Sequence, residues 1–232
     1  MLEAVLFDWG GTLMRFTWDD ELLAAGHRAG LAALGRESET AEFSAHFARE
    51  TLPRLLEPGA ATRLDYAAEL RVLLGALTDD ELDRFVDAEH AAWAPARALA
   101  HDAHALLESL RARGLGLAVV ANTWPDPARV VRRELDELGV TARVDAVVLS
   151  GEVGVRKPGR AIFELALADL GVAAGNALFV GDRLVDDVQG AATVGMTTVQ
   201  ALWFNADDSP GKAEPDHQAF TPVDVLNLVR AH

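Results

Sequence analysis

The 232-residue sequence contains no cysteine. Disulfide bonds and thiolate metal sites are therefore excluded, and a reducing cytoplasmic location is the natural interpretation. The sequence also lacks any apolar run near the roughly 18 residues that a membrane-spanning helix needs. No basic segment followed by an apolar segment precedes the first predicted strand, so we expect neither a signal peptide nor a membrane partner.

Lysine is scarce, because Lys157 and Lys212 are the only two in the chain. The 21 basic residues face 36 acidic ones, which gives a net charge of 21 − 36 = −15. Such a surface repels polyanions, so we expect no nucleic-acid partner. Half of the residues are apolar, enough for a substantial core. Nothing in the sequence indicates an oligomeric state.

From about residue 101 onward, the sequence alternates between apolar strands and amphipathic helices. Strands are predicted at 115–121, 144–149, 177–180 and 197–201. Helices are predicted at 101–113, 159–170 and 186–194, and a further helix starts with Asp126 as its N-cap and Pro127 at its first position. Strands that are apolar throughout, separated by helices, indicate a parallel sheet covered on both faces.

The segment 15–98 has helical stripes of leucine and phenylalanine and no convincing strand. It is interpreted as an insertion of four or five helices. The predicted fold class is therefore α/β: a Rossmann-like core with a parallel sheet, formed by residues 1–14 and 99–232, and an inserted all-helical cap domain, residues 15–98. Residues 205–217 are predicted to form a surface loop before a short last helix.

The first predicted strand, residues 4–7, ends at Asp8 and is followed by Trp9-Gly10-Gly11-Thr12. A buried strand thus delivers a carboxylate to its tip, and the two glycines let the backbone turn tightly. Glycine amides at such a turn are expected to be free to approach an anion. The pattern fits an aspartate nucleophile beside a metal ion.

Polar residues also follow the other predicted strands. They are Asn122 and Thr123 after Ala121, Lys157 before Pro158, Asp182 after Gly181, and Asp187 five residues later. The carboxyl ends of parallel strands share one edge of the sheet, so these side chains should converge. Buried carboxylates repel one another, and Mg²⁺ prefers oxygen ligands. Lys157 can neutralise Asp8 and an incoming phosphate.

These four motifs, in this order, resemble those of the haloacid dehalogenase superfamily of aspartate-nucleophile hydrolases, and the resemblance covers the whole chain. It implies that Asp8 attacks phosphorus and forms an aspartyl-phosphate, with Lys157 as the second catalytic residue. It further implies a Mg²⁺ ion. The implied metal ligands are Asp8, Asp182, Asp187 and the carbonyl of Gly10; the implied substrate-binding residues are Gly11, Thr12, Asn122, Thr123 and Lys157.

The sequence departs from this family pattern at two positions. Gly10 stands where most phosphatases of the family have a second aspartate, which protonates the leaving group and later activates water. Such general acid–base help is worth roughly 10²–10⁴ in rate. Ala121 stands where a phosphate-binding hydroxyl is expected, and losing one hydroxyl contact costs on the order of 1 kcal/mol. Thr123, two residues later, is an alternative source of this hydroxyl, although the shift of two positions is expected to give it a different direction.

The resemblance leads to a Mg²⁺-dependent hydrolase, a phosphatase of a small phosphorylated metabolite, as the main hypothesis. The alternative is a catalytically weak or inactive relative that binds a phosphate-bearing ligand or a protein partner. Dehalogenases of the family have tyrosine at the position of Gly10 and lack the Gly181-Asp182 and Asp187 pattern, which argues against that activity. Phosphonatases use a cap lysine, and segment 15–98 contains none.

Overall fold

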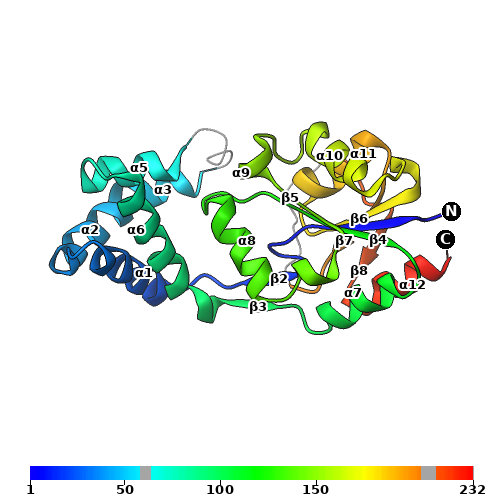
Figure 1. The fold of residues 1–232 in the computed structure, drawn as a ribbon, viewed down its shortest axis with the longest axis horizontal. Helices are drawn as coiled ribbons and strands as arrows, with labels where there is room; N and C mark the ends of the chain where they lie inside the picture. The colour runs from blue at the N-terminus through cyan, green and yellow to red at the C-terminus, as the bar shows by residue number, and fades with distance from the viewer. Residues whose placement is uncertain (58–63, 205–212, 232) are drawn as a thin grey trace. The chain divides into compact units, whose positions relative to one another are not determined.

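The computed structural model describes residues 1–57, 64–204 and 213–231. The chain forms two compact units. The first contains Met1–Phe16, Ala98–Thr123 and Val131–His232, and the second contains Thr17–Arg97 and Trp124–Val130. Figure 1 shows a sheet with flanking helices in the first unit and a group of helices in the second. That residues 15–98 form a separate cap domain stays a prediction.

The first unit is built on a six-stranded sheet with the order β5-β4-β1-β6-β7-β8. The strands are β1 (Ala4–Phe7), β4 (Gly116–Ala121), β5 (Ala146–Leu149), β6 (Ala177–Gly181), β7 (Thr197–Ala201) and β8 (His217–Ala219). All neighbouring strands run parallel. This confirms the predicted α/β class, and β1, which precedes Asp8, lies inside the sheet between β4 and β6.

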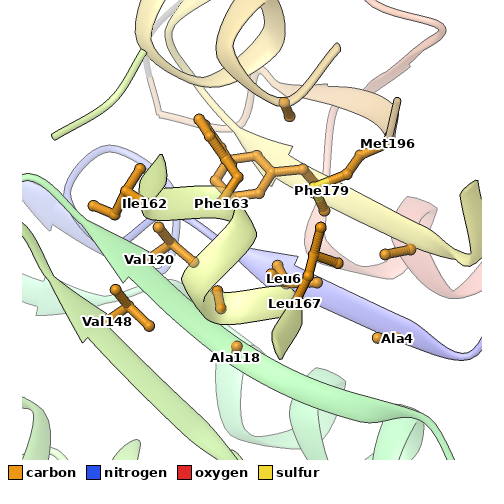
Figure 2. Close-up of a cluster of buried hydrophobic side chains, with 13 residues drawn as sticks. Ala4, Leu6, Ala118, Val120, Val148, Ile162, Phe163, Leu167, Phe179 and Met196 are labelled. Carbon is orange, nitrogen blue, oxygen red and sulfur yellow. The ribbon is translucent and has the colours of Figure 1, made fainter. Parts of the chain in front are cut away.

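Helices lie on both sides of this sheet (Figure 1). They are α7 (Ala103–Arg111), α8 (Ala128–Glu137), α9 (Ser150–Val153), α10 (Arg160–Leu170), the π-helical turn η6 (Leu184–Gln189), α11 (Gly190–Val194), α12 (Pro222–Ala231), and the short turns η4 (Thr141–Arg143) and η5 (Ala174–Asn176). Figure 2 shows how α10 packs Ile162, Phe163 and Leu167 against alternate residues of the central strands, among them Leu6 and Phe179. The rings of Phe163 and Phe179 meet edge to face, with centroids 5.1 Å apart.

The second unit contains helices throughout its described part. They are α1 (Asp20–Ala33), η1 (Glu37–Glu39), α2 (Thr40–His46), the π-helical turn η2 (Phe47–Thr51), α3 (Leu52–Leu55), α5 (Tyr66–Leu74), α6 (Asp79–Ala92) and η3 (Ala94–Ala96). Gly30 lets α1 approach α6 closely, because an added Cβ would lie 2.7 Å from the ring of Phe85. A core of leucine and aromatic side chains fills the space between these helices.

Three short strands were not expected from the sequence. β2 (Met14–Phe16) pairs with β3 (Arg97–Leu99) at the two ends of the segment predicted to lack strands. β8 includes His217, the last residue of the predicted surface loop 205–217; residues 205–212 of that loop lie outside the described residues. Strands of three residues are too short to show an alternating pattern, so these predictions were wrong at the segment ends. Within the described ranges, no helix is long and apolar enough to cross a membrane.

Candidate active site

Four charged side chains meet at the carboxyl edge of the sheet. Asp8 directly follows β1, and Asp182 directly follows β6. Lys157 lies between α9 and α10, and Asp187 lies in the turn η6. One carboxylate oxygen from each of the three aspartates lies within 4.8 Å of the others. The structure therefore brings together the four residues that the sequence placed after three different strands.

Lys157 binds two of these carboxylates. Its Nζ donates to Asp8 Oδ1 at 2.5 Å and to Asp187 Oδ1 at 2.6 Å. All three residues are buried, with Lys157 only 2% exposed and Asp187 fully inaccessible. The other oxygen of Asp187 accepts the backbone N–H of Arg183 at 3.0 Å. Asp187 is thus held from both sides, and it holds the ammonium group against Asp8.

The electrostatics of the cluster favour a further cation. Burial, together with the neighbouring carboxylates of Asp8 and Asp187, raises the pKa of Asp182 to about 8. Burial likewise raises the pKa of Asp8 to about 6, against the lowering effect of Lys157. Burial would lower the pKa of Lys157, but the two carboxylates raise it above its ordinary value. Three carboxylates against one ammonium leave a formal charge of −3 + 1 = −2.

The residues present fit a divalent metal ion. Asp182 Oδ1 is buried and has no hydrogen-bond partner among the described residues. Leaving such an oxygen unpaired is costly, whereas a hard cation satisfies it directly. The donors are all oxygen atoms, and their excess charge of two matches a dication. Asp8, Asp182 and Asp187 are the side chains that could hold it.

Two glycines permit the close approach of these carboxylates. Gly11 has φ +91°, and a Cβ there would lie 2.4 Å from Asp182 Oδ2. A Cβ at Gly181 would lie 2.4 Å from the Cβ of Asp187. Contacts below 3 Å force atoms to shift, so any side chain at either position would displace a proposed metal ligand. The glycines therefore belong to the site for reasons of space.

Gly10 differs from its neighbour Gly11. It is exposed, and nothing lies within 4 Å of a Cβ added to it. Space therefore does not explain why this position lacks the aspartate that the family resemblance leads one to expect.

Ala121 is the other position at which the sequence departs from the family pattern. It is the last residue of β4 and pairs with Leu149 of β5. Ser150 follows Leu149, and its hydroxyl accepts the backbone N–H of Thr123 at 3.1 Å.

Of the residues expected to bind substrate, Gly11 and Asn122 already have hydrogen-bond partners within the protein, whereas the Thr12 hydroxyl has none among the described residues. The N–H of Gly11 donates to the carbonyl of Met14 at 2.8 Å, so the expectation that this amide is free for an anion was wrong. Asn122 exchanges two hydrogen bonds with the backbone of Lys157, donating to its carbonyl at 3.1 Å and accepting its N–H at 3.0 Å. Thr12 is buried, and its hydroxyl has no partner among the described residues.

Sequence reasoning missed several side-chain contacts around Trp9, Thr12 and Asp182. Trp9 Nε1 donates to Glu134 Oε2 at 2.9 Å, and Trp203 Nε1 donates to the carbonyl of Thr12 at 2.8 Å. Gln200 Nε2 reaches the carbonyl of Asp182 at 3.5 Å. These partners are separated by 125, 191 and 18 residues in the chain, and no local motif signals the two longer-range pairs.

Comparisons with known proteins agree with one another. The sequence model of the family described as haloacid dehalogenase-like hydrolase matches residues 2–195. A ribulose-1,5-bisphosphate 5-phosphatase of Halopiger xanaduensis is 30% identical over 97% of this chain and 97% of that protein. A phosphoserine phosphatase of Thermus thermophilus is 38% identical over 50% of this chain and 45% of that protein. The crystal structure of a HAD phosphatase from Thermococcus onnurineus covers 98% of both chains, with a TM-score of 0.67 and 26% identity.

Proposed function

Because the chain belongs to the haloacid dehalogenase-like hydrolase family, we propose that it hydrolyses phosphoric monoesters of small metabolites with Asp8 as the nucleophile. The observation that carries this proposal is the buried cluster of Asp8, Lys157, Asp182 and Asp187. The relative that matches over its whole length and the relative that matches over half both carry names of phosphatases of small phosphorylated metabolites. They support this substrate class for the present chain.

In the proposed reaction, a carboxylate oxygen of Asp8 attacks phosphorus, and the bond between phosphorus and the ester oxygen breaks. Water then hydrolyses the aspartyl-phosphate, which releases phosphate and restores Asp8. Lys157 orients the nucleophile through its hydrogen bond to Asp8 Oδ1 and offsets negative charge on the phosphoryl oxygens. Asp187 keeps the ammonium in place.

A Mg²⁺ ion is the proposed cofactor, held by Asp8, Asp182 and Asp187 together with the carbonyl of Gly10. When bound, it would counter the charge of the phosphate and of the carboxylates. Burial of Asp182 Oδ1 without a protein partner supports this assignment. The phosphate itself would be bound by Lys157, Thr12, Thr123 and the backbone amide of Asn122.

Gly10 limits the proposed activity. With no side chain at this position, the leaving oxygen receives no proton from it, so esters whose leaving group needs protonation should react slowly. The proton must then come from water, from the substrate or from another residue. The proposed phosphatase should therefore favour substrates that have a good leaving group or an acidic group of their own.

An assay with p-nitrophenyl phosphate and Mg²⁺ tests the proposal, because its leaving group needs little protonation. We expect turnover that is lost on chelation with EDTA and in the variant Asp8→Asn. Asp169→Asn, which changes an exposed carboxylate on α10, is the matched control and should keep the parent rate. Turnover that survives in Asp8→Asn would contradict the role of Asp8.

A second candidate function is binding of a phosphate-bearing ligand or protein partner without efficient turnover. The absence of a side chain at Gly10 and of a hydroxyl at Ala121 favours it. The same protein would then show no turnover of p-nitrophenyl phosphate but would bind inorganic phosphate in a Mg²⁺-dependent way, measured by calorimetry. Absence of both turnover and metal binding would remove the hydrolase proposal.

A further inference from the structure

The loop from Asp8 to Met14 carries two adjacent glycines, Gly10 and Gly11. Glycine has more accessible backbone conformations than any other residue, so it loses the most freedom when the loop becomes ordered. The loop closes on itself through three backbone hydrogen bonds. Gly11 N–H donates to Met14 O at 2.8 Å, and the N–H groups of Thr12 and Met14 donate to Trp9 O at 3.3 and 2.9 Å. Catalysis by Asp8 requires this loop to stay in one conformation.

Two indole groups hold the loop on either side of the glycines. Before them, Trp9 is 4% exposed and donates its Nε1–H to Glu134 Oε2, on a side chain that is 8% exposed. After them, the carbonyl of Thr12 accepts the Nε1–H of Trp203, which follows β7. A bond to a buried carboxylate is stronger than one between neutral groups, because the charge is poorly screened there.

We propose that Trp9, Glu134 and Trp203 form an indole clamp that fixes the loop from Asp8 to Met14 and so positions the nucleophile. This inference rests on the proposed function for its catalytic consequence. Glu134 and Trp203 are positioning residues, because they act through Trp9 and Thr12.

Amide hydrogen exchange of the folded protein tests the clamp without any turnover. In Trp203→Phe and in Trp9→Phe an aromatic six-membered ring remains, while the indole N–H donor and its five-membered ring are lost. We expect the amides of Gly11 and Met14 to exchange at least tenfold faster in both variants, with amides of β4 unchanged. Trp18→Phe is the matched control, because Trp18 donates to Asp20 at 2.8 Å in the second unit. Unchanged exchange at Gly11 and Met14 in both clamp variants would overturn the proposal.

Steady-state kinetics with p-nitrophenyl phosphate separate positioning from general stability. We expect Trp203→Phe and Glu134→Leu to lower kcat about tenfold with KM within twofold, since a misplaced nucleophile affects the chemical step. Glu134→Gln keeps an oxygen acceptor and should restore kcat to within twofold of the parent. A Glu134→Gln variant as slow as Glu134→Leu would contradict the hydrogen-bond role. If the parent enzyme shows no turnover, the proposed function fails while the exchange experiment still decides the clamp.

Discussion

Gly10 and Gly11 are adjacent, yet their surroundings call for opposite outcomes on substitution. We predict that Gly11→Ala lowers Mg²⁺-dependent activity at least tenfold and destabilises the fold. Its φ of +91° costs a non-glycine residue about 1–2 kcal/mol, and its Cβ would displace the Asp182 carboxylate. Gly10→Ala is the matched control, because its Cβ meets nothing within 4 Å. Calorimetric Mg²⁺ titration and urea unfolding of both variants check this prediction; equal effects would contradict it.

The open space at Gly10 makes it possible to restore an acid there. We predict that Gly10→Asp raises kcat on alkyl phosphates by roughly 10²-fold, the lower end of what general acid–base catalysis supplies. Turnover of p-nitrophenyl phosphate should change little, because that leaving group needs little protonation. The measurement is the ratio of the two rates in parent and variant. An unchanged ratio would mean that another acid already protonates the leaving group.

The charged residues of the candidate site could be predicted from sequence because each follows a recognisable buried strand or motif. Asp8, Lys157 and Asp182 meet since parallel strands end at one edge, whatever their order in the chain. Trp203 and Glu134 could not be predicted in the same way. They lie 191 and 125 residues from the residues they contact, and an isolated tryptophan or helical glutamate carries no signal of its partner.

Helices α1, α5 and α6 of the second unit share a buried polar network that sequence periodicity does not reveal. Tyr66 donates its hydroxyl to Glu89, at 2.9 Å from both carboxylate oxygens. His27 Nε2 lies 3.9 Å from Glu89 Oε1, and His27 Nδ1 lies 2.9 Å from the hydroxyl of Ser44. Burial raises the pKa of Glu89 to about 8 and lowers that of His27 to about 4. This pKa of Glu89 includes the lowering effect of the Tyr66 hydrogen bond, the raising effect of Asp126 and the lowering effect of Arg97.

This network predicts a stability that falls on both sides of mildly acidic pH. Glu89 holds its proton more tightly when folded, so its contribution is full below about pH 4.5 and is lost as pH rises to about 8. His27 contributes fully above about pH 6.5 and loses that contribution as pH falls to about 4. We therefore expect Glu89→Gln to become more stable relative to the parent as pH rises from 5 to 9.

Urea unfolding of Glu89→Gln and the parent at pH 5, 7 and 9 measures this difference. Glu81→Gln is the control on the same helix, because the backbone N–H of Thr78 lowers the pKa of the half-buried Glu81 instead of raising it. Its carboxylate is ionised throughout this range, so its effect on the free energy of unfolding should not vary between pH 6 and 9. A difference for Glu89→Gln that is constant from pH 5 to 9 would contradict the raised pKa.

At the level of elements, apolar strands and amphipathic helices were predictable, but their ends were not. Asp126 was predicted to cap a helix, yet α8 begins at Ala128, and the Asp126 carboxylate instead pairs with Arg97 at 3.3 Å. A long-range ion pair of this kind competes with local capping and leaves no trace in the sequence. The helix predicted at 186–194 differs in the opposite sense. It begins two residues earlier, at Leu184, as the π-helical turn that carries Asp187.

At the scale of the whole molecule, the net charge of −15 and the buried carboxylate cluster both oppose folding through repulsion. A dication bound only by the folded protein relieves the second effect. A ligand at about 100 times its Kd adds roughly 2.7 kcal/mol of stability. For a chain of this size, each kcal/mol corresponds to about 2–4 °C in melting temperature. We therefore predict that saturating Mg²⁺ raises the melting temperature by roughly 5–10 °C.

Asp182→Asn separates specific binding from general screening of the acidic surface. Without Mg²⁺, this variant should melt above the parent, because one of three mutually repelling carboxylates is removed and burial disfavours its charge. With Mg²⁺, the order should reverse, since the variant loses a metal ligand. NaCl at matched ionic strength controls for screening, which acts equally on both proteins. Equal shifts from Mg²⁺ in variant and parent would place the effect on the surface and contradict a metal site at the carboxyl edge of the sheet.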